Sequence, residues 1–222
     1  MGDVASLPGR PPVIAAATVL VQLFLSCAAL LGLAVLRNVL IARDPDDPIN
    51  RRFIFGVQVT MMLFVGRVLM ILTGVEAFRV LVLLAAGLIP LAVLLLTEGL
   101  LRRHAPPAIK SVMGVGAAIA AVSAFWYGGA IDPARLFALL GFQILGFILS
   151  GWLVLTRDRA SLSGAEIAMV VRLGLSLLLF IPLAVGDFLL LYINLPIQFS
   201  ALGVLNLCWL AIGLGRAHQG HW

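Results

Sequence analysis

Long apolar runs separated by short polar segments constrain the fold of this chain more than any other feature of its sequence. A helix of ~20 apolar residues crosses the ~30 Å hydrocarbon layer of a bilayer and satisfies its own backbone hydrogen bonds there. Of the residues, 62% are hydrophobic and 11% are charged, whereas a soluble domain is roughly half apolar and a quarter charged. A globule of this size cannot hide so much apolar surface. The sequence therefore predicts an all-α integral membrane protein.

The runs predict a single transmembrane domain over residues 1–222 that crosses the bilayer about seven times, as a bundle of helices. The expected helices cover residues 13–41, 53–73, 78–101, 109–127, 134–155, 165–191 and 196–214. The first run is too long for a cleavable signal peptide, so we expect it to remain as the first helix. The connections are short, so consecutive helices should be antiparallel neighbours without room for a soluble catalytic domain.

The distribution of arginine and lysine predicts the orientation, because cytoplasmic loops carry an excess of both residues. On one side they are numerous: Arg37, Arg43, Arg51, Arg52, Arg102, Arg103, Lys110, Arg157, Arg159 and Arg216. The opposite side has only Arg10, Arg79 and Arg135. We therefore expect the amino terminus outside and the carboxyl terminus in the cytoplasm. Arginine nearly replaces lysine, and Ala, Gly and Leu are abundant, a composition common in GC-rich bacteria that favours a bacterial inner membrane.

Four ionisable residues lie at bilayer depth, where charges are costly and usually face the interior of a bundle. They are Arg67, Glu98, Arg172 and Asp187. At ~1.5 Å of rise per residue, their depths permit Glu98 to pair with Arg172 and Arg67 to pair with Asp187. Alternatively, Glu98 pairs with Arg102 on its own helix, Asp187 reaches headgroup water, and Arg67 extends to the outer interface. Arg67 has no acidic residue one turn away, which makes it the strongest candidate for a functional charge.

Neutral polar residues extend this candidate intramembrane site. They are Gln58, Thr60, Gln143, Ser176, Gln198 and Asn206. Hydrogen bonds between helices are their more common role. The alternative is a polar pocket in the outer half of the bundle.

The pentapeptide Ile-Pro-Leu-Ala-Val occurs twice, at residues 89–93 and 181–185. The helices that contain it run in opposite directions, so the repeat would relate the first three helices to the next three by inversion. Many transporters are built from such inverted repeats. The repeat therefore favours transport as one hypothesis.

Several kinds of chemistry lack the residues that they need. A covalent retinal pigment requires a lysine in its last helix, but the only lysine is Lys110, at the start of the fourth. Axially ligated haem is not expected inside the bundle, because His104, His218 and His221 lie at or beyond the helix ends. No hydrolase, metalloprotease, phosphate-loop or cysteine-histidine metal motif is present. We expect no enzymatic activity, cofactor or metal.

The net charge of +5 and the isoelectric point near 10.2 come from basic residues in short loops beside apolar helices. Basic residues in such loops indicate the orientation of the helices in the membrane, so no nucleic-acid partner is predicted. The expected partners are the lipid bilayer and other membrane or cytoplasmic proteins, or a second copy of the chain.

The seven helices, the outside amino terminus and the segment from Pro48-Ile-Asn-Arg-Arg52 through Glu98-Gly-Leu-Leu-Arg-Arg-His104 resemble the seven-helix input modules of bacterial membrane sensors. The resemblance is one of pattern over the whole chain. It implies that the chain senses a ligand or a membrane state. Only about Gly215 to Trp222 follow the last helix, so a separate protein would carry the output. Two other hypotheses remain: a non-catalytic subunit of a larger membrane complex, and a small-solute transporter.

The orientation can be tested with fused reporters. We expect a reporter that is active only in the cytoplasm to work after Trp222 and to fail before Met1, because the arginine-rich loops should stay inside. The reverse result would place the amino terminus in the cytoplasm and exchange the depths of all four intramembrane charges.

Overall fold

A computed structural model describes residues 12–44, 46–125, 133–158, 162–193 and 199–219. These residues form seven α-helices and one 3₁₀ turn, which confirms the predicted all-α class. The helices are α1 (Pro12–Arg43), α2 (Pro48–Thr73), α3 (Arg79–Leu101), α4 (Pro107–Phe125), α5 (Pro133–Leu155), α6 (Gly164–Ile193) and α7 (Phe199–Gln219), with the 3₁₀ turn η2 at Glu76–Phe78. Helices α1 to α6 are long and apolar enough to cross a membrane, and α7 contributes a shorter apolar stretch, Phe199–Leu214.

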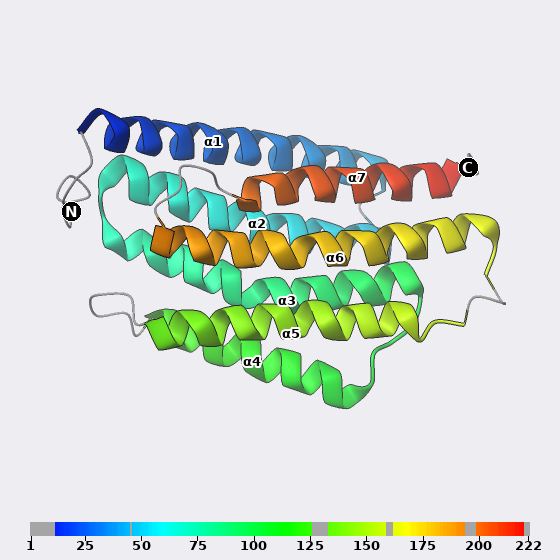
Figure 1. Ribbon diagram of the computed structural model, residues 1–222. Helices are drawn as coiled ribbons and strands as arrows, with labels where there is room; N and C mark the ends of the chain where they lie inside the picture. Colours follow the sequence, from blue (N-terminus) through cyan, green and yellow to red (C-terminus); the bar gives the residue numbers. More distant parts are fainter. Residues whose placement is uncertain (1–11, 45, 126–132, 159–161, 194–198, 220–222) are drawn as a thin grey trace.

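The helices pack side by side in two layers (Figure 1). One layer runs in the order α1, α2, α3 and α4, and the other runs α7, α6 and α5. Across the layers, α3 packs on α5 and α1 packs on α7, and the chain ends lie at opposite ends of the bundle. We call the end with the α1–α2, α3–α4 and α5–α6 connections the basic end. The predicted orientation would place it in the cytoplasm.

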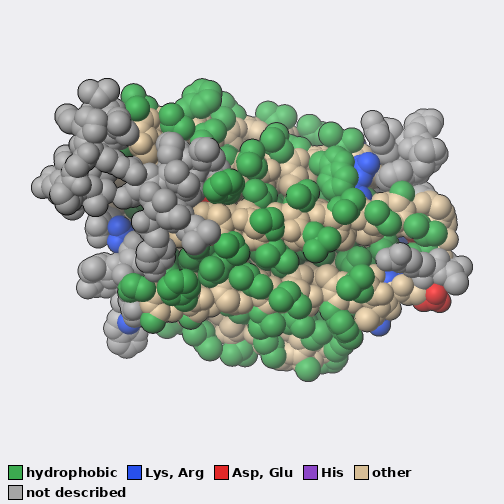
Figure 2. Space-filling view, in the orientation of Figure 1, with side chains coloured by type: hydrophobic (Ala, Val, Ile, Leu, Met, Phe, Trp, Pro, Cys, Tyr) green, Lys and Arg blue, Asp and Glu red, His purple; other side chains and the backbone are tan. Residues whose placement is uncertain are grey.

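The face of the bundle in Figure 2 is apolar, and the described basic side chains on this face lie near the two ends. Large exposed apolar side chains of the bundle include Phe24, Leu31, Leu178 and Leu205. A soluble monomer rarely exposes so large an apolar patch. The side surface therefore suits contact with the acyl chains of a lipid bilayer.

Helix α2 begins at Pro48, one turn before the predicted start at Phe53, because its first turn is polar and capped. The Asp47 carboxylate accepts the N–H groups of Ile49 at 3.2 Å and Asn50 at 3.4 Å. Proline suits the first helical position, because an N–H there would have no partner within the helix and its absence costs nothing. A search for apolar runs misses such a turn.

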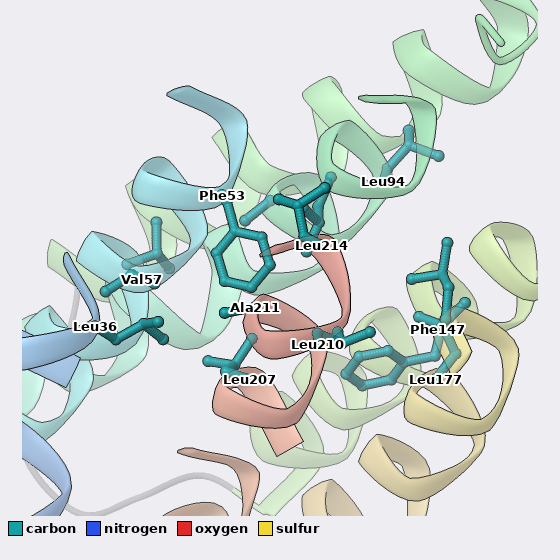
Figure 3. Close-up of a cluster of buried hydrophobic side chains, with 14 of the residues drawn as sticks. Leu36, Phe53, Val57, Leu94, Phe147, Leu177, Leu207, Leu210, Ala211 and Leu214 are labelled. Atoms are coloured by element: carbon teal, nitrogen blue, oxygen red, sulfur yellow. The ribbon is translucent and has the colours of Figure 1, made fainter. Parts of the chain in front are cut away.

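Buried apolar side chains join the two layers near the basic end (Figure 3). Phe53 and Val57 of α2 and Leu36 of α1 face Leu207 and Leu210 of α7. Phe53, Val57 and Leu210 are at most 1% exposed. Helix α7 is therefore held firmly along its inner half.

Helices α3 and α5 fit together around Pro90. Proline lacks the N–H that would bind the carbonyl oxygen of Ala86 four residues earlier. The side-chain Nε2 of Gln143 on α5 donates to that oxygen at 3.0 Å. One turn further along α5, Gly146 lies so close that a Cβ there would be 2.6 Å from the Cβ of Pro90. In the second copy of the pentapeptide Pro182 is exposed, so the two copies occupy different surroundings.

We expect Gln143→Leu to lower the free energy of unfolding by about 1–3 kcal/mol, because the Ala86 carbonyl would lose its buried partner. The matched control is Gln58→Leu, the same change at an exposed position of α2. It should leave the melting temperature in detergent unchanged or raise it. Equal losses from both variants would contradict this role for Gln143.

Candidate functional site

Arg67, Asp187 and Ser200 form a connected polar network between α2, α6 and α7, which we call the Arg67 network. Arg67 Nη2 donates to Asp187 Oδ2 at 2.7 Å, and Arg67 Nη1 donates to Ser200 Oγ. The backbone N–H of Ser200 donates to Asp187 Oδ1 at 2.9 Å. The structure thus brings together the two charges whose predicted depths matched, and Arg67 points to α6 and α7.

Local structure explains why Asp187 suits this position. Ser200 is the second residue of α7, so its N–H is one of the donors that a helix leaves unpaired at its amino terminus. The Asp187 carboxylate satisfies this donor and complements the positive end of the helix dipole. Phe64, a buried residue of the same helix, adds a cation–π contact. The guanidinium carbon of Arg67 lies 5.7 Å from the centroid of its ring.

The ion pair lies largely out of reach of solvent. The Arg67 side chain is 17% exposed and the Asp187 side chain is 11% exposed. At such a site charge-assisted hydrogen bonds are strong, and removing one partner leaves an uncompensated charge. The pair therefore ties the ends of α6 and α7 to α2.

A cavity of about 290 Å³ begins at the Arg67 network and continues between the two helix layers. Its walls come from α2, α3, α5, α6 and α7. The residues at its polar end are Arg67, Arg79, Asp187 and Ser200. Towards the basic end the walls become apolar, with Ile89, Val93, Leu177 and Leu207 among them. The cavity is thus a mainly apolar space with one charged end.

Two buried hydroxyl groups line this cavity without a hydrogen-bond partner among the described residues. They belong to Thr97 on α3 and Ser176 on α6, both 0% exposed. A buried hydroxyl without a partner is costly. Neither hydroxyl exposes surface to the cavity, so a molecule in the cavity reaches these two groups only if neighbouring side chains move.

The expected partners of Glu98 are wrong. Glu98 Oε1 lies 2.9 Å from Lys110 Nζ on α4 and accepts the N–H of Ala105, and its Oε2 lies 3.8 Å from Arg52 Nη1. It does not pair with Arg102, because that residue leaves the helix in a left-handed conformation with φ 48°. Glu98 therefore secures the α3–α4 turn at the basic end, away from the cavity.

Arg172 lies against α7 and not against Glu98. Its guanidinium carbon is 4.9 Å from the ring centroid of Trp209, and its Nη1 donates to the Trp209 carbonyl oxygen at 3.4 Å. The predicted depth of Arg172 placed it near the inner side, but rise along the helix does not tell which way a side chain points.

The neutral polar residues take separate roles. Gln58 is exposed on α2, which fits neither a hydrogen bond between buried helix faces nor a polar pocket, the two roles expected for it. Gln143 lines the cavity while it binds α3. Asn206 Nδ2 donates to the Ser176 carbonyl oxygen at 3.0 Å, a bond between α6 and α7. Gln198 lies outside the described residues.

Sequence reasoning missed Ser200, Arg79 and Thr97 as cavity residues. Thr97 had a usable signal, because Pro90, Val93 and Thr97 share one face of α3 at helical spacing. Ser200 had another, since a serine near the start of a helix commonly makes capping bonds.

Comparison with protein-family models, curated proteins and solved structures finds no match for this chain. Within the described ranges, no three His, Cys, Asp or Glu side chains come together as metal ligands. The chemistry of the site is therefore read from its geometry alone.

We expect Arg67→Leu and Asp187→Asn each to destabilise the protein and the double variant to lose less than their sum. The coupling should be about 0.5–3 kcal/mol, the range for residues in one network. Asparagine keeps an oxygen for the Ser200 N–H, so the cycle isolates the charge pair. Melting temperatures in detergent measure all four forms. Strictly additive losses would mean that Arg67 and Asp187 do not stabilise each other.

Proposed function

We propose that this chain is a membrane-embedded receptor module that binds a small, mainly apolar molecule between its helix layers and signals through a separate protein. The observation that carries the proposal is the cavity of about 290 Å³. A large apolar pocket with a few convergent polar groups is the usual form of a small-molecule site. Arg67, Asp187 and Ser200 are such groups here.

The size of the cavity supports a binding role over a packing defect. Protein interiors are packed as densely as organic crystals, and the walls of an empty space lose dispersion contacts. The volume is about twice that of the ~150 Å³ engineered cavity that binds benzene. Such a space weakens the bundle unless a molecule fills it.

The position of the cavity supports a route for the signal. It lies between α2 and α3 on one side and α5, α6 and α7 on the other. A ligand shifts a conformational equilibrium only through different affinities for the two states. A molecule here contacts both layers, so its affinity depends on their separation, and α6 and α7 extend from the cavity to the basic end.

A small-solute transporter remains the second candidate, because the same cavity would serve as its binding site. The two differ in access. A transporter must open the cavity to each side of the membrane in turn, whereas a receptor can keep its inner end closed. Thr97, at the inner end of the cavity, is fully buried in this structure, which favours the receptor.

We expect the chain purified in a bulky steroid detergent, without added lipid, to carry one small molecule in native mass spectrometry. Ala92→Leu combined with Ala184→Leu should remove it, because both alanines line the cavity and the added side chains fill about half of it. The control Ala118→Leu, at an exposed position of α4, should retain it. Equal occupancy in all three proteins would refute a ligand site in the cavity.

Accessibility then separates the two candidates. In sealed vesicles, a membrane-impermeant thiol reagent should leave a Thr97→Cys variant unlabelled from either side if the chain is a receptor. A control cysteine at exposed Ala108 of α4 should react from the side of the basic end. Labelling of the Thr97→Cys variant from that side would favour the transporter.

A further inference from the structure

The polar end of the cavity and its apolar walls together specify a class of ligand. We propose that the cavity takes an uncharged single-chain molecule with a hydroxyl, carbonyl or ester oxygen near one end, which accepts a hydrogen bond from Arg67 while the chain extends along the apolar walls. This inference rests on the proposed function, because it names the ligand of the same cavity.

The charged groups on the cavity wall already have partners within the protein. Arg67 Nη2 lies 2.7 Å from Asp187 Oδ2, so these two charges compensate each other. Arg79 is the other cationic residue among the described lining residues, and it also takes part in an interaction. The described part of the wall therefore supplies no free charge to a charged ligand.

A charged headgroup would be unfavourable beside this ion pair. An anion that accepts a hydrogen bond from Arg67 would lie close to the Asp187 carboxylate, and a cation at Asp187 would lie close to the Arg67 guanidinium. Arg67 is six residues before the end of α2 at Thr73, or ~9 Å along the helix. An uncompensated charge at bilayer depth is costly, so a neutral group suits this position better.

The groups left over at the Arg67 network are hydrogen-bond donors. Each carboxylate oxygen of Asp187 already accepts one bond. A guanidinium carries five N–H groups, and Arg67 uses one for Asp187 and one for Ser200. Arg67 Nε makes no hydrogen bond to a described residue and is not a buried atom, so it borders open space. The ligand group that complements this end of the cavity is therefore an acceptor.

The cavity is long and narrow. Partly buried side chains that line it run from Thr60 to Met70 on α2 and from Val82 to Val93 on α3, which is ~15 Å or more at ~1.5 Å per residue. A volume of about 290 Å³ over that length has a mean width of ~5 Å, little more than the ~4 Å contact distance between carbon atoms. This shape favours a single hydrocarbon chain over a bulky ring system.

The test uses the full chain in nanodiscs of phosphatidylcholine and probes that compete with tritiated hexadecanol. Hexadecanol and methyl palmitate are uncharged acceptors, hexadecane lacks a polar group, palmitate is anionic in an alkaline buffer, and hexadecyltrimethylammonium is cationic. Each concentration is expressed as a mole fraction of the bilayer. We expect the two acceptors to bind about tenfold more tightly than hexadecane, the gain from one hydrogen bond to a charged group. The two charged probes should bind no more tightly than hexadecane.

Two results in the parent chain would contradict the proposed class. Tighter binding of palmitate or of hexadecyltrimethylammonium than of hexadecanol would overturn the uncharged ligand. Methyl palmitate can accept a hydrogen bond but cannot donate one. Its failure to bind where hexadecanol binds would therefore overturn the acceptor role of the ligand.

Variants of the Arg67 network test the polar contact itself. Arg67→Leu with Asp187→Asn removes both charges together and should reduce the tenfold preference for hexadecanol over hexadecane to about equal binding, because the guanidinium donors are lost. Arg67→Lys is a second variant that keeps a positive charge beside Asp187, and it should also reduce the preference. The control Gln58→Leu, at an exposed position of α2, should keep it. A preference that survives in both Arg67 variants would overturn the role of Arg67.

Cavity-filling variants separate this inference from the proposed function. Equal binding of hexadecanol and hexadecane in the parent chain, abolished by Ala92→Leu with Ala184→Leu, would overturn the polar contact and keep the cavity as a binding site. Failure of every probe in the parent chain, together with no copurified molecule, would overturn both.

Discussion

A bilayer offers no water to an unpaired polar group, and this constraint decides where the polar side chains of the bundle lie. Gln143 binds the carbonyl that Pro90 leaves unpaired, and Asp187 binds both Arg67 and an unpaired donor of α7. In each case a side chain of one helix forms a hydrogen bond with a backbone group that another helix leaves unpaired. The polar contacts therefore help to determine which helices are neighbours. An apolar helix surface is less selective, because lipid could cover it as well as another helix could.

Thr97 and Ser176 depart from that rule, since neither hydroxyl has a partner among the described residues. Both lie on the wall of the cavity. Buried polar atoms of Asn50, Ser150, Arg157 and Asn206 also have no partner among the described residues, and none of these four residues lines the cavity. Unsatisfied groups therefore occur in several parts of the bundle. The volume of the cavity, and not the unsatisfied hydroxyl groups, supports the proposed binding role.

The sequence predicts where a residue lies along its helix. It does not predict which neighbour a side chain faces, because that depends on how the helix is rotated about its axis. Apolar runs locate the helices, and rise per residue correctly matched the depths of Arg67 and Asp187. The same arithmetic wrongly offered Arg172 to Glu98, because the direction of a side chain depends on how neighbouring helices pack. For the same reason Gln58, a candidate for a hydrogen bond between helices, is exposed. The first turn of α2 was missed for a different reason, since the carboxylate of Asp47 forms it and apolar residues do not.

The Arg67 network connects the cavity to α7 through shared donors. Arg67 holds Ser200 directly and holds Asp187, which in turn accepts the Ser200 N–H. A molecule in the cavity that contacts the Arg67 guanidinium would act on the same group that holds Asp187 and Ser200, and so on the start of α7. The inner half of α7 stays packed on Phe53 and Val57 of α2. Ligand binding would therefore move the outer end of α7 while its inner half stays packed, and so change the tilt of α7. A separate output protein at the basic end could detect this change in tilt.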